Sequence, residues 1–255
     1  MTDAATPALK ARLAMLTQAR IGLGRVGAGL PNRAMLDFQM AHALARDAVH
    51  AGLDTQRLID GLSPGAIAVS SAAVDRPTYL QRPDLGRRLD GPSADRLAAI
   101  AAEGPFDLAI VVADGLSSMA VMAHAAAVAN ALRAQLPLWS IAPDIVAHQG
   151  RVALGDDIGA RIGARMVVVL IGERPGLSAF DSLGAYITWR PAPERMDSER
   201  NCVSNIRPPH GLSHQAAAGK IAWLLRRARA LELTGIALKD EQSSDRLTAF
   251  HGEPG

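Results

Sequence analysis

The chain has 255 residues, 49% apolar and 20% charged, with a formal net charge of +2, as expected of a protein with a buried core. The basic residues form no stripe with interleaved aromatics, and no segment reaches the ~20 apolar residues that span a bilayer, so we predict neither a nucleic-acid nor a membrane partner. Cys202 is the single cysteine, which excludes an intrachain disulfide and favours a reducing compartment.

The first hundred residues show helical patterns separated by breaks. Residues 8–21 carry leucine and alanine at helical spacing, and residues 33–50 place apolar side chains on one broad face. Ser93 is the predicted N-cap of a further helix over residues 94–102. These patterns predict a smaller helical N-terminal region over residues 1–104.

Beyond this region, short apolar runs alternate with helical stretches. The predicted strands are 107–112, 136–141, 166–171, 186–189 and 202–206, and the predicted helices are 116–132 and 213–233. The run at 166–171 has no polar alternation, which predicts a central strand buried on both faces. The alternation predicts an α/β fold with a mostly parallel sheet flanked by helices. We expect this α/β domain over residues 105–240 and a loose tail over residues 241–255.

Gly22, Gly24 and Gly27 form a Gly-x-Gly-x-x-Gly pattern, with Asp47 near the distance expected of a ribose-binding carboxylate. The pattern binds a dinucleotide only where a strand precedes it and a helix N-terminus follows it. Here a helical pattern precedes it, which favours a glycine-rich turn between helices. A nicotinamide-dependent oxidoreductase stays an alternative, and a strand before Gly22 would support it.

No other motif supplies a complete set of reacting groups. The seven histidines are scattered and a single cysteine cannot build a structural zinc site, so the sequence predicts no metal site. It contains no Gly-Lys-Ser/Thr phosphate loop and no Gly-x-Ser-x-Gly elbow. We predict no catalytic residue on this chain, and a non-catalytic binding module is a second alternative.

Three constrained segments lie at or near predicted strands: residues 114–117 (DGLS), 173–176 (ERPG) and 201–206 (NCVSNI). Ligands of open parallel sheets bind beyond the carboxyl ends of strands, although ordinary turn chemistry also uses these residue types. The charged pair Glu173 and Arg174 directly follows a buried strand, which favours a ligand site. The residues alone therefore predict a ligand-binding α/β domain.

Six blocks of sequence carry a resemblance to one enzyme family. They are residues 24–27 (GRVG), 79–89 (YLQRPDLGRRL), 114–117 (DGLS), 150–152 (GRV), 172–177 (GERPGL) and 202–206 (CVSNI). On these blocks the chain resembles the small subunit, or light chain, of ethanolamine ammonia-lyase along nearly its whole length. Six blocks in one order are far more specific than a single motif.

The resemblance implies a hetero-oligomeric enzyme that converts ethanolamine to acetaldehyde and ammonia by a radical mechanism, with adenosylcobalamin (coenzyme B12) as cofactor. It implies that the large subunit, a β/α barrel, binds ethanolamine. Because the sequence contains no complete acid–base or nucleophile set, we predict that this chain is inactive without that partner. The family's cobalamin-contacting positions fall on Val152, Glu173 and Cys202. A carboxylate can accept hydrogen bonds from the cofactor, while the other two side chains offer apolar and soft contacts.

The resemblance also bears on location. Family members that enter bacterial microcompartments carry a longer N-terminal extension with a targeting helix, whereas this chain begins almost at the matching region. Its first residues also lack the charged and apolar regions of a secretory signal. We therefore expect a cytoplasmic protein, with a bacterial microcompartment as the alternative, and assign no function to the tail beyond Lys239.

Overall fold

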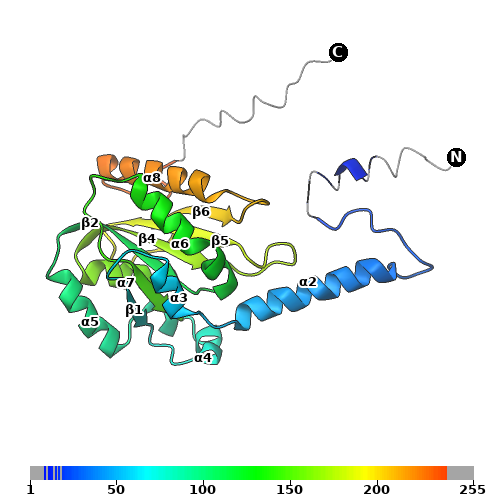
Figure 1. The fold of residues 1–255 in the computed structure, drawn as a ribbon, viewed down its shortest axis with the longest axis horizontal. Helices are drawn as coiled ribbons and strands as arrows, with labels where there is room; N and C mark the ends of the chain where they lie inside the picture. Colours follow the sequence, from blue (N-terminus) through cyan, green and yellow to red (C-terminus); the bar gives the residue numbers. More distant parts are fainter. Residues whose placement is uncertain (1–8, 10, 14, 16, 18, 240–255) are drawn as a thin grey trace, which may run out of the picture.

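The computed structural model describes residues 9, 11–13, 15, 17 and 19–239 (Figure 1). The α-helices are α2 (Asn32–His50), α3 (Thr55–Asp60), α4 (Arg76–Gln81), α5 (Gly91–Ala101), α6 (Ser118–Ala134), α7 (Leu154–Arg161) and α8 (His214–Leu231). The strands are β1 (Ile67–Ser70), β2 (Phe106–Ala113), β3 (Ile145–His148), β4 (Ala164–Gly172), β5 (Leu183–Trp189) and β6 (Asn201–Ile206). Two short 3-10 helices are η1 (Leu85–Arg87) and η2 (Asp197–Glu199).

All six strands form one sheet in the order β1-β3-β2-β4-β5-β6. The strands β1, β3, β2 and β4 pair in parallel, whereas β5 pairs antiparallel with both β4 and β6. The predicted α/β class is therefore confirmed, but the sheet is mixed rather than mostly parallel. The reversal occurs because β4 returns into β5 through a loop, whereas a parallel neighbour would need a crossover connection.

Strand β4 lies between β2 and β5, which confirms the central position predicted for residues 166–171. Successive side chains of a strand point to opposite faces. Met166 and Leu170 belong to the core cluster that contains the inner faces of α6 and α8. Val167 and Val169 belong to the cluster on the other face, with α5 and α7. Helices thus cover both faces of β4, as its unbroken apolar run requires.

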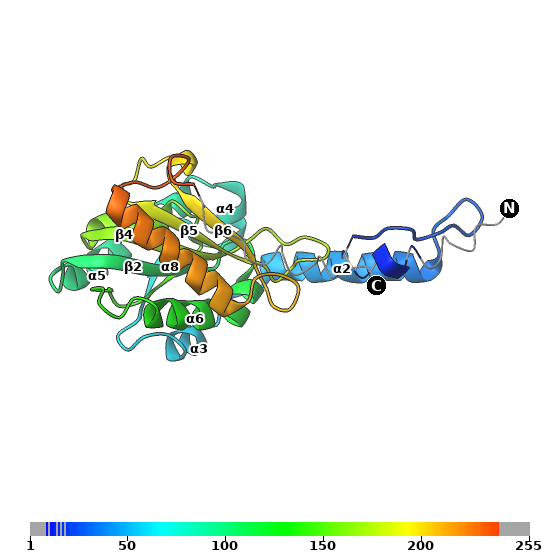
Figure 2. The same ribbon diagram turned by 90° about the horizontal axis from the view of Figure 1, so that it is seen from above.

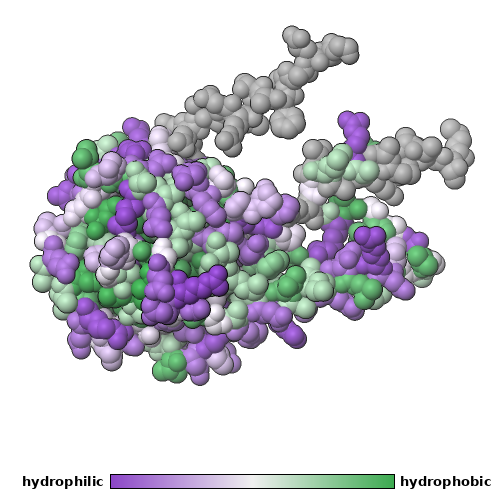
Figure 3. Space-filling view, in the orientation of Figure 1, coloured by the Kyte–Doolittle hydropathy of each residue, from purple (hydrophilic) through white to green (hydrophobic). Residues whose placement is uncertain are grey.

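Helix α2 confirms the second predicted helix and projects from the rest of the fold as an arm (Figures 1 and 2). Ala48 is its single buried residue, while Met35 and Phe38 are exposed. Figure 3 shows hydrophobic and hydrophilic side chains mixed along the arm. Its base is fixed where Arg76 Nε donates to Val49 O at 2.7 Å. Because so little of α2 is buried, tertiary packing contributes little to its stability.

The start of α5 differs from the prediction. Asp90 is the N-cap instead of Ser93, and its Oδ1 accepts a hydrogen bond from Ser93 N at 2.7 Å. The Ser93 hydroxyl instead accepts a hydrogen bond from Ser70 N at 2.9 Å, so it ties α5 to the end of β1.

Two strands were not predicted, and one predicted strand is wrong. β1 and β3 are each four residues long, too short for a clear pattern, and β1 adds a strand to the region predicted as helical. The predicted strand at 136–141 is mainly a turn, with one isolated bridge between Leu108 and Ile141. Pro137 interrupts its apolar run, and Leu138 is 93% exposed.

Two predicted segments fall partly or wholly outside the described residues. Residues 9, 11–13 and 15 are helical, as predicted for 8–21, whereas residues 19–21 are not. The predicted tail at 241–255 lies outside the described residues. Within the described part of the chain, no helix combines the length and apolar character needed to cross a bilayer.

Candidate functional site

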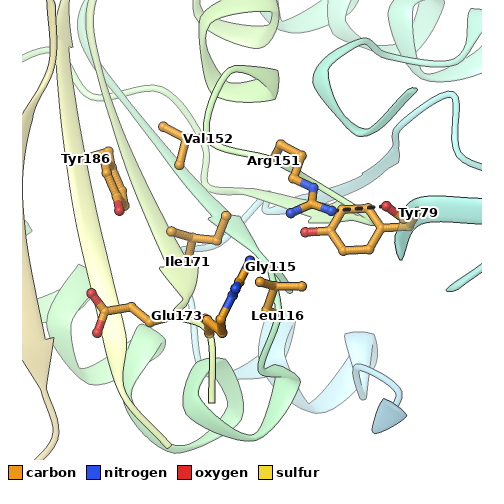
Figure 4. Close-up of a pocket in the computed structure, with 10 residues that line it drawn as sticks. Tyr79, Gly115, Leu116, Arg151, Val152, Ile171, Glu173 and Tyr186 are labelled. Atoms are coloured by element: carbon orange, nitrogen blue, oxygen red, sulfur yellow. Dashed lines mark hydrogen bonds between the residues drawn. The ribbon is translucent and has the colours of Figure 1, made fainter. Parts of the chain in front are cut away.

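The connections that follow β2 and β3 diverge. The first leads into α6 on one face of the sheet, and the second leads into α7 on the other. Such divergence opens a crevice beyond the carboxyl ends of the strands. A cavity of about 450 Å³ lies there (Figure 4), lined by Tyr79, Gly115, Leu116, Arg151, Val152, Ile171, Gly172, Glu173, Arg174 and Tyr186.

Two glycines let the loops after β2 and β4 meet at this cavity. Leu116 N donates a hydrogen bond to Gly172 O at 3.0 Å. Gly115 has a φ of +56°, and a Cβ on it would lie 2.3 Å from Gly172 O. A Cβ on Gly172 would lie 2.1 Å from Ser117 O. The predicted segments at 114–117 and 173–176 are therefore neighbours, and this contact requires glycine at both positions.

Asp114 joins the loop after β2 to the loop after β3. Its carboxylate accepts hydrogen bonds from Gln149 N and Gly150 N, each at 3.0 Å, and lies 3.6 Å from the Arg76 guanidinium. Burial raises the pKa of this carboxyl, although the two amides and Arg76 favour its charged form. Because Asp114 is buried and does not line the cavity, its carboxylate serves to hold the loops together.

Tyr79 and Arg151 form one wall of the cavity (Figure 4). The Tyr79 hydroxyl donates to Gly150 O at 3.1 Å, and burial raises its pKa to about 12, so it stays protonated at neutral pH. The Arg151 guanidinium carbon lies 4.2 Å from the centre of the Tyr79 ring, and Nη2 donates to Tyr79 O at 3.1 Å. A Cβ on Gly86 would lie 2.9 Å from Arg151 Cγ, so glycine there allows this packing.

Glu173 lies on the opposite wall, directly beyond β4 (Figure 4). Its Oε1 accepts a hydrogen bond from Ser204 Oγ at 2.6 Å. Its Oε2 accepts one from Ser182 Oγ at 2.5 Å and a longer one from Asn205 N at 3.4 Å. The start of β5 and the end of β6 therefore hold a half-buried carboxylate at the edge of the cavity.

Tyr186 and Cys202 lie opposite each other on β5 and β6. Burial, together with the nearby thiol, raises the pKa of Tyr186 to about 12, so its hydroxyl is a hydrogen-bond donor at neutral pH. Cys202 is exposed at the surface. The protein around it still displaces enough water to raise the pKa of the thiol, although the Tyr186 hydroxyl acts in the opposite direction. Cys202 is therefore a neutral thiol at pH 7.

The cavity brings together two of the three predicted site residues. Val152 and Glu173 both line it, whereas Cys202 does not and reaches it only through its neighbour Tyr186. Tyr79 and Arg151 lie within the blocks that carry the resemblance, but neither had been assigned a role. Tyr186 lies outside those blocks, and only the in-and-out alternation of β5 and β6 could have indicated its position.

The competing motifs lie elsewhere. Residues 19–21 before Gly22 form no strand, and Val26 and Gly29 close a tight turn through two backbone hydrogen bonds of 3.0 and 3.1 Å. This geometry counts against the dinucleotide site. Among the described residues no group of three His, Cys, Asp or Glu side chains could hold a metal ion. His124 Nδ1 and His214 Nε2 lie 3.0 Å apart and form only a pair.

The fold and the cavity define an α/β protein with a ligand crevice at the carboxyl edge of its sheet. A family model described as "Ethanolamine ammonia-lyase light chain" matches residues 8–239. A protein of Bradyrhizobium diazoefficiens named "Ethanolamine ammonia-lyase small subunit" is 56% identical, with 96% of each chain covered. Proteins of the same name from Rhodopseudomonas palustris and Azotobacter vinelandii are 55% and 52% identical, covering 93% and 96% of this chain and 92% and 93% of their own.

The chain belongs to the ethanolamine ammonia-lyase small-subunit family. The name implies a lyase complex in which a larger subunit is the partner.

Proposed function

We propose that this chain binds part of the adenosylcobalamin of an ethanolamine ammonia-lyase, and that the large subunit binds ethanolamine. The observation that carries the proposal is the meeting of Val152 and Glu173 in one cavity at the carboxyl edge of the sheet, with Cys202 one residue away across the β5–β6 pair. Three segments far apart in sequence supply these residues.

The chemistry of the cavity fits a cobalamin. Leu116, Val152 and Ile171 offer an apolar surface to the corrin or its base. Glu173 offers a charged acceptor to carboxamide or ribose donors, and the Tyr186 hydroxyl offers a donor to carbonyl oxygens. Adenosylcobalamin, when bound, would supply the radical chemistry of the reaction. This chain's own residues bind and orient the cofactor and exclude water from one side of it.

A larger partner accounts for the remainder of the site. A cavity of about 450 Å³ is smaller than a corrin with its side chains and nucleotide, so it can contact only part of the cofactor. We propose a hetero-oligomer in the cytoplasm in which the large subunit covers the rest. Because the cavity contains no complete acid–base or nucleophile set, we propose that the isolated chain has no lyase activity.

The test is a spectral titration of adenosylcobalamin into the isolated chain, the isolated large subunit and the assembled complex. We expect a stoichiometric corrin spectrum and acetaldehyde formation only from the complex. A complex that assembles but binds no corrin would favour the non-catalytic binding module. Acetaldehyde from this chain alone, or reduction of a nicotinamide cofactor, would overturn the assignment.

A further inference from the structure

The Glu173 side chain is held by more groups than a surface carboxylate ordinarily meets. Ser204 Oγ donates to Oε1 at 2.6 Å, and Ser182 Oγ donates to Oε2 at 2.5 Å. Asn205 N adds a third, longer contact at 3.4 Å. The donors come from the start of β5 and the end of β6, which lie side by side in the antiparallel pair: Ser182 directly precedes β5, and Ser204 and Asn205 lie near the end of β6.

The backbone around Glu173 also fixes the position of this residue. Glu173 N donates to Ser182 O at 2.9 Å, so the two residues extend the β4–β5 pairing beyond the strand. A Cβ on Gly184 would lie 3.0 Å from Glu173 Oε1 and 3.2 Å from its Cγ, so glycine leaves room for the side chain. Main chain and side chain of Glu173 are therefore both fixed before any ligand arrives.

A carboxylate has about four acceptor positions, so three donors leave capacity for a ligand. Fixing the oxygens in advance lowers the entropy lost on binding. Because Glu173 lines the cavity, that capacity is available to a ligand there. A carboxylate accepts hydrogen bonds and repels anions, so a ligand group that contacts Glu173 has to be a hydrogen-bond donor, and the carboxamides and ribose hydroxyls of a cobalamin meet this requirement.

We propose that Ser182 and Ser204 are positioning residues, which pre-orient Glu173 to accept a hydrogen bond from a carboxamide or ribose hydroxyl of the cofactor. This inference rests on the proposed function. Ser204 is the better probe because it is exposed, so removing its hydroxyl leaves no buried cavity, whereas Ser182 is only 5% exposed.

The experiment measures cobalamin affinity by spectral titration of the assembled complex for Ser204→Ala, Glu173→Ala and the double variant. Ser204→Thr keeps a hydroxyl. As a control, Ser140→Ala removes a comparable hydroxyl, which donates to Pro105 O at 3.2 Å just before the start of β2, at the end of the sheet away from the cavity. We expect Ser204→Ala to weaken cobalamin binding roughly threefold to tenfold. Ser204→Thr should restore the affinity, and Ser140→Ala should leave it unchanged.

The double variant separates positioning from a general structural role. If Ser204 acts through Glu173, Ser204→Ala has no further effect once Glu173 is alanine, and ethanolamine affinity at saturating cofactor does not change. Equal losses in both backgrounds, or no loss in the parent, overturn the positioning role and leave the proposed function intact. An unchanged cobalamin affinity in Glu173→Ala overturns the proposed function itself.

Discussion

At Glu173, the carboxylate that follows β4 is the charged acceptor of the cavity wall. Replacing it by alanine removes this acceptor from the proposed cofactor contact, at a cost of about 1.5–3 kcal/mol, or roughly a tenfold to hundredfold loss of affinity. We expect the Glu173→Ala complex to bind adenosylcobalamin that much more weakly. Ethanolamine affinity at saturating cofactor should change little, because the proposed function assigns the substrate contacts to the partner.

The control for this substitution is Glu103→Ala, which removes an exposed glutamate just before the start of β2, at the end of the sheet away from the cavity. It should alter neither affinity. If Glu173→Ala instead lowers ethanolamine affinity and leaves cofactor affinity unchanged, Glu173 belongs to another site.

Cys202 provides a prediction about pH. Alkylation requires the thiolate, and the raised pKa of this thiol lowers the thiolate fraction at any pH below that pKa. Iodoacetamide should therefore modify Cys202 more slowly at pH 7 than an ordinary thiol of pKa about 8.5, and the rate should rise with pH beyond the range where such a thiol is already saturated. Mass spectrometry of the isolated chain over a pH series measures this.

The Tyr186→Phe variant tests the opposing effect of the Tyr186 hydroxyl on the pKa of Cys202. The Tyr186 hydroxyl stabilises the thiolate by a hydrogen bond, so its removal should raise the pKa of Cys202 further and slow alkylation again. Faster alkylation in this variant would contradict the geometry given for the pair.

Among the elements, β4 was the most predictable, because an unbroken apolar run is stable as a strand only where helices cover both faces of the sheet. β1 and β3 could not be predicted because four residues carry too little pattern, and both depend on parallel pairing with their neighbours, β1 with β3 and β3 also with β2. The reversal at β5 was also hidden, since an antiparallel return needs only a loop that periodicity does not distinguish from a crossover.

The central position of β4 gives a stability prediction. Leu170 is fully buried in the cluster with α6 and α8, so Leu170→Ala should lower the free energy of unfolding by about 2–5 kcal/mol. Leu138 is 93% exposed, so Leu138→Ala should change it by no more than about 0.5 kcal/mol. Urea titration of the two variants measures the difference. Equal effects would mean that β4 is not the centre of the core.

For the whole molecule, sequence blocks indicated the residues of the site but not their arrangement. Five of the six blocks contribute residues to the cavity or lie beside it, whereas residues 24–27 precede α2 at the outer end of the arm. Their meeting depends on the order of the strands and on the turn back into β5. The spacing of residue types along the sequence indicates neither of these features, so the contacts of Glu173 with Ser182 and Ser204 could not be predicted.

The incomplete cavity leads to a prediction about assembly. If the cofactor is bound between this chain and the large subunit, each has only part of its binding surface, and cofactor binding and subunit association must strengthen each other by the same factor. Adenosylcobalamin at 100 times its dissociation constant would stabilise the complex by about 2.7 kcal/mol relative to the separated subunits. Sedimentation with and without cofactor should show the subunit dissociation constant falling by roughly a hundredfold. The Glu173→Ala complex should require more cofactor for the same decrease. A subunit dissociation constant that does not change with cofactor would place the cobalamin site on the large subunit alone.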